Sequence, residues 1–312
     1  MLTRVIVTAL VGIGVTSTVA SAETASSVSM DGTIHFSLGT GTFKEPANED
    51  VDARSLRFSF EGNLNLSEKF KIGIDISHSK LNLSRAGNPD FDIDFTRISV
   101  APTYSFGNGV HTGFYLQDAS AGITGFSLNF ESYGAFVGYS GNTFSVEGYA
   151  GKTSFGALGP DGVEGDDVGV IGTFRPVENL QIFAHYSREK LGVDFPDVSL
   201  SAIGAEYEFG SGWAVFGAFS STDVANNAAS VRQTSIGVSY DLAQHGMPGI
   251  VSLDWSDTDY GVIGLKQNIV SLGWTIPFGG AAAAPQTCTM NNARGKNRSA
   301  FAASLECNPG IL

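Results

Sequence analysis

The sequence predicts an all-β fold, a transmembrane antiparallel up-and-down β-barrel of about fourteen strands, within a range of about 12 to 16. Three observations carry this prediction. Large apolar side chains recur at every second position, the opposite face of the same segments carries charge, and tight turns alternate with longer, more acidic links. A soluble sheet packed on the charged face would bury unpaired charge, so the apolar face is expected to contact lipid.

The chain opens with a segment that has the features of a secretory signal peptide. Arg4 precedes the apolar run VIVTALVGIGVTSTV, which ends in Ala-Ser-Ala at residues 20–22, an A-x-A cleavage pattern. We therefore expect residues 1–22 to be removed on export. An uncleaved anchor helix is the alternative, and it is disfavoured because the run is short for a membrane span and is interrupted by Gly and Thr.

Alternation continues along nearly the whole chain to residue 278 and sets the positions of the strands. In the segment SLRFSFEGNL, Leu56 and Phe60 share one face, and Arg57 and Glu61 share the other. The sixth segment changes phase near Ser132, and a β-bulge there would restore the face. The expected strands cover residues 30–38, 53–64, 70–81, 93–105, 110–118, 125–139, 143–153, 166–175, 180–189, 198–209, 213–222, 231–242, 249–257 and 266–278.

The links between the expected strands are of two kinds. After even-numbered strands they are tight turns such as FGNG and FGSG, whose Gly and Asn residues supply the backbone angles of hairpins. After most odd-numbered strands they are longer and more acidic, as in TGTFKEPANEDVD. Aromatic residues gather beside the short turns, as expected for a girdle at a membrane–water interface. The predicted interface aromatics are Tyr104, Tyr139, Trp213, Tyr240, Trp274 and Phe278.

The last expected strand carries the most specific resemblance. Its alternating apolar side chains end on an aromatic and are Val270, Leu272, Trp274, Ile276 and Phe278. Together with the leader, the even strand number and the two kinds of link, this strand resembles the porin-like outer-membrane β-barrels of Gram-negative bacteria, over roughly residues 30–278. The resemblance implies an outer-membrane location, contact with outer-membrane lipid and lipopolysaccharide, insertion by the barrel assembly machinery, and a homotrimer as one allowed assembly.

Barrel width predicts a lumen, because about eight strands leave an interior filled by side chains and about sixteen to eighteen leave an aqueous channel. The inward-folding third loop of trimeric porins has no counterpart, since the link near Ala119 to Thr124 is short. Each ionisable residue of the wall is either a pore-lining group or a wall position without an individual role. The predicted pore-lining residues are Arg57, Glu61, Lys71, Asp75, Asp94, Glu147, Arg175, Arg232 and Asp254.

The charge distribution favours one class of solute. Without the leader the chain has 17 basic and 31 acidic side chains, a net charge of −14, which excludes a nucleic-acid-binding protein. Acidic residues crowd the long-link end, and their field attracts cations and repels anions. The expected function is a passive channel (porin) for diffusion of small hydrophilic solutes or ions, with mild cation selectivity. The alternative is a structural or adhesive barrel without transport activity.

An enzymatic interpretation has one candidate pair. His185 and Ser187 lie two residues apart on one strand face, which is similar to the His-x-Ser pair of outer-membrane phospholipases, but the alternation turns both towards the lumen and away from lipid. We therefore expect no enzymatic activity. The remaining histidines show no metal-ligand spacing and GPDGVEGDDVG lacks that of a calcium loop, so neither a metal site nor a cofactor is expected.

Residues 279–312 form a tail of different composition. The small-residue stretch GGAAAAPQTC is followed by a segment without strand alternation. The tail carries Arg294, Lys296, Arg298 and Glu306, a net charge of +2, which leaves −16 on residues 23–278. The two regions are therefore expected to be separate parts of the molecule.

The cysteines support this division. Cys288 and Cys307 are the only ones, both lie in the tail, and we expect them to form a disulfide because the periplasm is oxidising. The expected organisation is a signal peptide at 1–22, a barrel at 23–278 and a periplasmic tail at 279–312. The role of the tail is open among a plug, a contact with the cell wall, a partner site and a dispensable extension.

Overall fold

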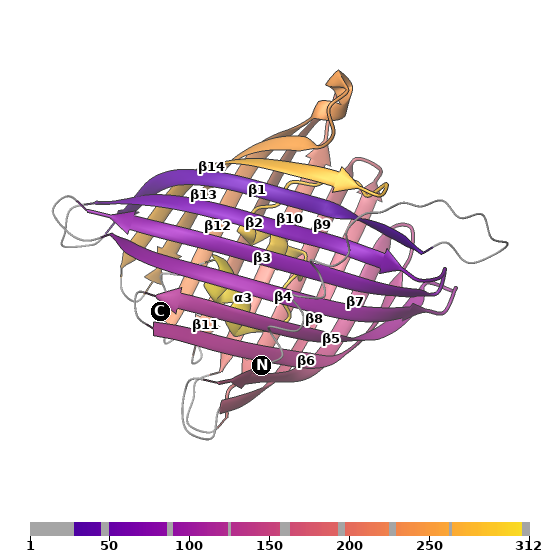
Figure 1. The fold of residues 1–312 in the computed structure, drawn as a ribbon, viewed down its shortest axis with the longest axis horizontal. Helices are drawn as coiled ribbons and strands as arrows, with labels where there is room; N and C mark the ends of the chain where they lie inside the picture. The colour runs from indigo at the N-terminus through magenta and orange to yellow at the C-terminus, as the bar shows by residue number, and fades with distance from the viewer. Residues whose placement is uncertain are drawn as a thin grey trace.

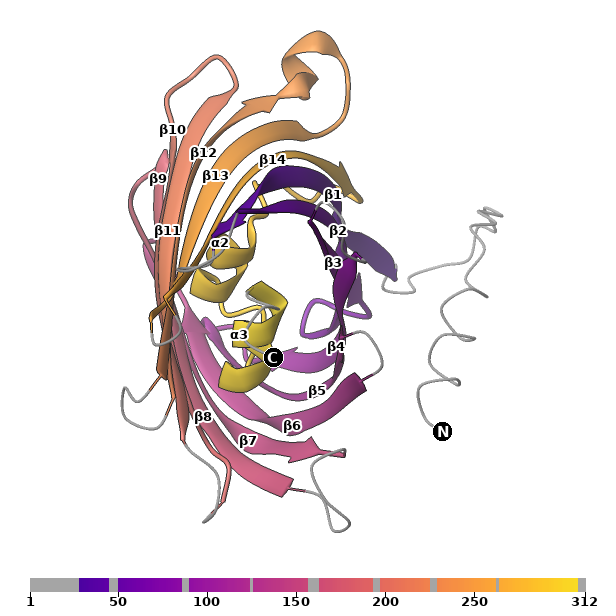
Figure 2. The ribbon, with the colours of Figure 1, turned by 90° about the vertical axis from the view of Figure 1, so that its left-hand side faces the viewer.

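The structure is a computed structural model in which residues 28–44, 50–85, 90–123, 126–156, 163–192, 197–224, 229–261 and 264–307 are described. The predicted signal peptide lies outside these residues. Within them, fourteen antiparallel strands close into a barrel, each paired with its neighbours along the chain, and the last strand pairs with the first (Figures 1 and 2). The predicted fold class and strand number are confirmed.

The strands match the expected segments closely. Their bounds are β1 Ser29–Lys44, β2 Val51–Asn65, β3 Phe70–Ser84, β4 Phe91–Ser105, β5 Val110–Ile123, β6 Phe126–Ser140, β7 Phe144–Phe155, β8 Val163–Val177, β9 Leu180–Lys190, β10 Val198–Glu208, β11 Trp213–Val224, β12 Ala229–Asp241, β13 Ile250–Tyr260 and β14 Leu265–Phe278. A short 3-10 helix, η1 (Leu242–His245), lies in the link from β12 to β13. No helix among the described residues is long and apolar enough to cross a membrane.

The links differ less in length than the sequence predicted. β1 continues to Lys44, whereas the expected strand ended at residue 38, so much of the link TGTFKEPANEDVD is strand. The even-numbered strands still end in turns, and we call that end of the barrel the short-turn mouth. The opposite end is the long-link mouth. Strand extension at the long-link mouth therefore replaces much of the loop that was expected there.

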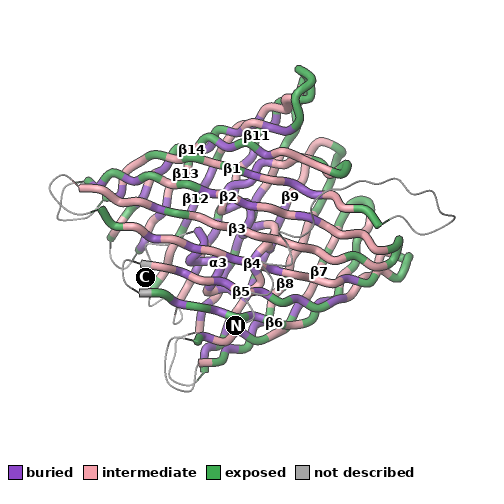
Figure 3. The backbone as a smooth tube through the Cα atoms, in the orientation of Figure 1, coloured by how far each residue is buried: buried purple, intermediate pink, exposed green. Residues whose placement is uncertain are grey.

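The alternation separates an outer from an inner face, as predicted. In β14, Val270, Leu272 and Trp274 are between 44% and 58% exposed and point outward, whereas Gln267 and Thr275 are buried and point inward. Figure 3 shows the same alternation of buried and exposed positions along the other strands. The apolar face of each strand therefore covers the outside of the barrel.

Near the long-link mouth the inward face becomes apolar. Phe95, Phe130 and Phe155 point into the barrel and are at most 1% exposed. β6 keeps one continuous register with both neighbours, so the predicted bulge near Ser132 is wrong. The phase change in the sequence has a different cause, because Phe130 packs inside the barrel while Tyr133 is exposed on the outside.

The tail occupies the interior of the barrel. It forms two short helices, α2 (Cys288–Ala293) and α3 (Ala300–Cys307), which lie within the ring of strands in Figure 2. The sequence placed this tail on the periplasmic side and did not locate it relative to the lumen. Among the alternatives that the sequence left open, the structure has the tail in the position of a plug.

Candidate functional site

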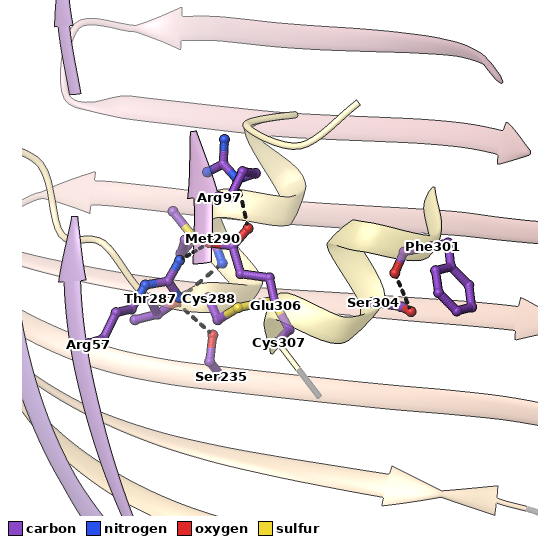
Figure 4. Close-up of a disulfide and its surroundings, with 10 residues drawn as sticks. All are labelled: Arg57, Arg97, Ser235, Thr287, Cys288, Met290, Phe301, Ser304, Glu306 and Cys307. Atoms are coloured by element: carbon purple, nitrogen blue, oxygen red, sulfur yellow. Dashed lines mark hydrogen bonds and ion pairs between the residues drawn. A yellow bond between two sulfur atoms is a disulfide. The ribbon is translucent and has the colours of Figure 1, made fainter. Parts of the chain in front are cut away.

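The candidate functional site is the lumen together with the tail that fills it. After β14 ends at Phe278, the chain turns into the barrel from the short-turn mouth. A disulfide joins Cys288 at the start of α2 to Cys307 at the end of α3, which confirms the predicted pair (Figure 4). Both helices and the segment between them thus form one closed loop inside the barrel.

Local sequence explains why the two helices form. Thr287 caps α2, since its side-chain oxygen accepts a hydrogen bond from the backbone amide of Met290 at 3.2 Å. Ser299 plays the same part for α3, accepting from the amide of Ala302 at 3.1 Å. Between the helices, Gly295 adopts a φ of 65°, and a side chain there would also collide with Ile171 of the wall.

Each cation of the tail meets an acidic residue of the wall. Arg294 binds Glu206 of β10 at 3.0 Å, and Arg298 binds Glu147 of β7 at 2.6 Å. Lys296 forms an ion pair with Glu61 of β2. The guanidinium of Arg298 also lies over the rings of Tyr115, Phe136 and Tyr149, at 4.8 to 5.8 Å from their centroids. The basic segment of the tail is therefore matched to wall acids on three sides of the barrel.

The single acidic residue of the described tail has the opposite environment. Glu306 accepts hydrogen bonds from Arg57 of β2 at 2.6 Å and from Arg97 of β4 at 3.1 Å (Figure 4). Arg97 also binds Asp75 at 2.9 Å. Burial opposes ionisation of Glu306, but the charges of Arg97 and Arg57 outweigh it and hold the pKa of Glu306 below its ordinary value. The tail thus carries an acid where the wall supplies bases.

The wall also contacts uncharged polar groups of the tail. Glu189 of β9 accepts hydrogen bonds from the Ser299 hydroxyl at 2.8 Å and from the Phe301 amide at 3.1 Å, at the start of α3. Gln117 donates to the Asn297 side chain at 2.9 Å. Asp167 lies directly opposite Glu189 in the strand register, and both carboxylates are buried. Polar side chains of the wall therefore form hydrogen bonds with the tail at positions where the tail itself carries no charge.

Two apolar patches of the inner wall receive the helices. Phe301 of α3 packs edge-on against Phe130 and Phe155, with centroid distances of 5.4 Å to each. α2 places Met290 and Ala293 against β10, where Gly204 leaves room, because a side chain at that position would approach both residues within 3.1 Å. The inward phenylalanines of the long-link half thus form a binding surface for α3.

Most of the predicted pore-lining residues lie on the inner face. Arg57, Glu61, Asp75 and Glu147 contact the tail or its partners, and Asp254 borders the space beside it. Lys71 and Arg175 lie on the inward face of their strands at the short-turn mouth, where both are exposed.

Two predicted pore-lining residues lie on the outer face, which corrects their assignment. Asp94 lies opposite Lys80 in the strand register, on the face away from the buried Ile93 and Phe95. Arg232 is exposed opposite Asp259, whereas its neighbour Gln233 is buried inside. At the long-link end of the strands the outer face carries charge, so these residues point towards solvent rather than into the lumen.

The six predicted interface aromatics all lie on the outer face of their strands. All except Trp274 are at or next to the strand ends that form the short-turn mouth. Tyr104, Tyr139, Trp213 and Trp274 are 39% to 44% exposed. The ring of Tyr240 lies 4.8 Å from that of Trp213, and Phe278 stacks on Phe60 at 5.7 Å.

The His185 and Ser187 pair points inward, as the alternation predicted, and His185 takes part in tail binding. Nδ1 of His185 lies 2.9 Å from the carbonyl oxygen of Asn292, and Nε2 lies 2.8 Å from the hydroxyl of Tyr149. Ser187 is buried beside it on β9. Among the described residues, no group of three or more His, Cys, Asp or Glu side chains is arranged to hold a metal ion.

Sequence reasoning missed several wall residues that bind the tail, among them Arg97, Glu189 and Glu206. Strand parity assigns Arg97 and Glu206 to the lumen, although with an uncertain phase, and gives no sign that they bind the tail. The signal that could have found them was charge complementarity, since the tail offers three bases and one acid to a strongly acidic barrel. Glu189 carries no such signal, because its partners are a hydroxyl and a backbone amide.

Comparison with known proteins gives matches of shape. No protein-family model and no curated protein sequence matches the chain. The TodX deltaS2S3 mutant monoaromatic hydrocarbon channel matches with a TM-score of 0.54 at 10% identity, over 80% of this chain and 90% of that chain. A Pseudomonas aeruginosa FadL homologue gives 0.52 at 9% identity, over 80% and 90%. An anion-selective porin from Comamonas acidovorans gives 0.50 at 13% identity, over 81% and 99%.

The fold is shared with channel-forming β-barrels. Two of these three similar proteins are described as a hydrocarbon channel and an anion-selective porin, so barrels of this shape pass solutes of unlike chemistry. The solute that passes a given barrel is therefore set by the residues that line its own lumen.

Proposed function

We propose that this chain is an outer-membrane channel for passive diffusion of small hydrophilic solutes. The observation that carries the proposal is the division of one closed barrel into an apolar outer face and an inner face rich in charged and polar side chains. Closure leaves no unpaired strand edge, so such a barrel satisfies its backbone hydrogen bonds in lipid. A wetted inner wall of mixed charge favours polar solutes over apolar ones.

The tail acts in this proposal as an internal constriction. It contacts β2 through Arg57 and β9 through Glu189, so it extends from one side of the lumen to another. Space remains beside it: a cavity of about 300 Å³ borders Glu61, Glu147 and Arg298 towards the short-turn mouth. The conducting path runs between the tail and the wall, which restricts passage to small solutes.

Mild cation selectivity is the second part of the proposal. Residues 23–278 carry a net charge of −16, and the tail returns only +2. The three basic side chains of the tail pair with three wall acids, which weakens the field inside the bore without reversing it. The preference for cations is therefore smaller than the charge of the wall alone would produce.

Planar-bilayer recording tests the proposal. The full-length protein, purified from the outer-membrane fraction, is expected to give small stepwise conductances, and reversal potentials across a salt gradient should indicate cation preference. Liposome-swelling rates should fall as the size of an uncharged sugar increases. Anion preference would contradict the selectivity, and recovery of the protein in the soluble periplasmic fraction would contradict the location.

One observation favours a second candidate, a structural or adhesive barrel without transport: the tail lies across the lumen. Planar-bilayer recording also distinguishes the two candidate functions. A barrel without transport is silent both as the full chain and after removal of residues 279–312, whereas a constricted channel conducts better once the tail is removed. No catalytic step is part of either proposal, and ester hydrolysis by the purified protein would contradict both.

A further inference from the structure

A second space inside the barrel has the features of a binding chamber. A cavity of about 110 Å³ lies between the tail and the wall formed by β1–β3 and β12–β14. Its boundary includes Arg57, Ser79, Gln233 and Asp254 from the wall, and Glu306 with the disulfide from the tail. Serine side chains of these strands supply much of the polar part of its lining.

Several polar atoms of the chamber wall lack a partner. Within the described part of the chain, Nε of Arg57, Oγ of Ser79 and Oε1 of Gln233 are buried and form no hydrogen bond. Arg57 and Gln233 are only 8% and 6% exposed. A buried polar group without a partner is costly, so native proteins satisfy it with protein, water or ligand. The chamber thus offers one donor, one acceptor and one hydroxyl to an occupant.

One carboxylate at the boundary of the chamber lacks an ion-pair partner. Of the four ionisable residues that border the chamber, Arg57 binds Glu306, and Lys80 binds Asp92 on the outer face of the barrel. Asp254 is only 8% exposed and forms no ion pair with the described residues. Arg57 is the cation that acts on it electrostatically, and its charge is already engaged. Both bordering cations are therefore engaged, and Asp254 is left without a cation of its own.

We propose that this chamber binds a small primary ammonium compound that also carries a hydroxyl group. The ammonium group pairs with Asp254, and the hydroxyl uses the free polar atoms of Arg57 and Gln233. An apolar cavity of about 150 Å³ accommodates benzene, so a chamber of about 110 Å³ has room for roughly four non-hydrogen atoms. The inference deepens the proposed channel function by naming its solute class, but the binding step itself does not require conduction.

Other small solutes fit the chamber less well. An anion would meet both Asp254 and Glu306, and the guanidinium groups that could offset this repulsion are already paired. A neutral diol of the same size would satisfy the hydrogen-bonding atoms and leave Asp254 without a counter-charge. Charge-assisted hydrogen bonds are roughly twice as strong as neutral ones, so the ammonium compound is bound preferentially.

Binding is tested with three probes of nearly equal size. Ethanolamine, ethylene glycol and glycolate are cationic, neutral and anionic, and saturation-transfer NMR reports the binding of each to the full-length barrel in detergent micelles. Ethanolamine should bind saturably, ethylene glycol more weakly and glycolate not at all. The variant Asp254→Asn should weaken ethanolamine binding by at least about tenfold, since it removes a charged partner.

Asp259→Asn is the matched control, because Asp259 lies on the same strand and loses the same charge but faces outward, opposite Lys266. It should bind ethanolamine as the parent does. Equal affinities for the cationic and neutral probes, no saturable binding of ethanolamine, or equal losses in the two variants would each overturn the proposal. Because binding is measured without a conductance, silence in the bilayer would count against the channel and not against the chamber.

Discussion

The wall of the barrel and the tail inside it are specified by the sequence in different ways. In the wall, one pattern of alternating polarity is repeated in fourteen strands, and each strand pairs only with its sequence neighbours apart from the closing pair of β1 and β14. In the tail, no pattern repeats, and the contacts that place it join residues far apart in the chain, such as Lys296 and Glu61. The wall follows from local periodicity, whereas the tail follows from complementarity to a surface that must already exist.

The difference shows that an inward-facing charged residue can have either of two roles in this protein, lining the pore or binding the tail. Glu61, Glu147 and Glu206 could serve as bare pore-lining groups, but in the structure they hold the tail. A lumen residue therefore contributes to selectivity only to the extent that the tail leaves its charge uncompensated. Separating the two parts experimentally tests this view.

Removal of the tail should have the largest effect. A stop codon after Gly279 leaves the fourteen strands intact and removes the tail from the lumen. A fourteen-stranded barrel is wider than the eight-stranded barrels that side chains fill, and narrower than the barrels of sixteen to eighteen strands that hold an aqueous channel. We expect conductance to rise severalfold and cation selectivity to increase, because three bases leave with the tail. Single-channel recording measures both, and heat-modifiable gel mobility checks that the barrel is closed. An unchanged conductance would show that the tail does not restrict the path.

The substitution Glu306→Gln should have the next largest effect. It leaves the buried guanidinium groups of Arg57 and Arg97 without this carboxylate, and loss of one partner of a buried ion pair costs about 3–5 kcal/mol. The basic segment of the tail supplies trypsin sites, so the cleavage rate of the folded protein reports undocking. That rate should rise by roughly two to four orders of magnitude. Glu131→Gln, an exposed position on β6, should leave it unchanged.

Loss of the disulfide should destabilise the docked tail to a smaller extent. Cys288→Ser opens a loop whose ends are 19 residues apart, which corresponds to about 3 kcal/mol in the chain-entropy model. Trypsin should then cleave the tail faster without reductant, and the parent should approach this rate when reductant is added. The double variant Cys288→Ser with Cys307→Ser is the control for a free thiol. Equal cleavage of parent and variants would contradict a stabilising role.

Acid should loosen the tail through Glu306. The pKa of Glu306 is lowered in the folded protein, so its contribution to stability is fully present above its ordinary value of 4.5 and is lost as the pH falls through the lowered value. Because other acids titrate in the same range, the measured quantity is the difference in tail protection between the parent and Glu306→Gln. This difference should be constant from neutral pH to about 4.5 and should shrink at lower pH. A difference independent of pH would contradict the role of the carboxylate.

The smallest effect is expected at the edge of the tail. Lys296 and Glu61 are 26% and 35% exposed at their side chains, and partly exposed ion pairs contribute about 0.2–1 kcal/mol. Lys296→Gln should therefore change tail protection little. It should shift the reversal potential towards cations, because Glu61 loses its counter-charge. Lys266→Gln removes a cation from the outer face and should shift the potential less.

The strands and the disulfide could be predicted because their signals are local or unique. Alternation in β14 fixed its faces, and two cysteines allow one intramolecular pair. The position of the tail could not be predicted, because Arg57, Arg97 and Glu306 lie far apart in sequence, and nothing in their spacing shows that they meet. The composition shows that a basic tail complements an acidic barrel, but it does not show which wall residues the tail contacts.

The errors at Asp94 and Arg232 have different causes. Phe95 resembles an outward apolar residue, yet it packs in the cluster that receives α3, so its neighbour Asp94 was assigned to the wrong face. In β12, Ile236 lies on the same face as Arg232 and is 60% exposed on the outside, so the alternation, followed from Ile236, places Arg232 outside as well. The alternation is reliable only where the apolar face meets lipid, and it misleads where the tail supplies an apolar partner inside.

The seam between β1 and β14 has a consequence for biogenesis. The tail begins where the seam strand ends, and its partners are distributed over strands from β1 to β12, so its complete set of contacts exists only when those strands have come together. A newly made molecule should therefore pass through an unfilled stage before its last segment settles. The lifetime of that stage would decide how much the nascent protein leaks.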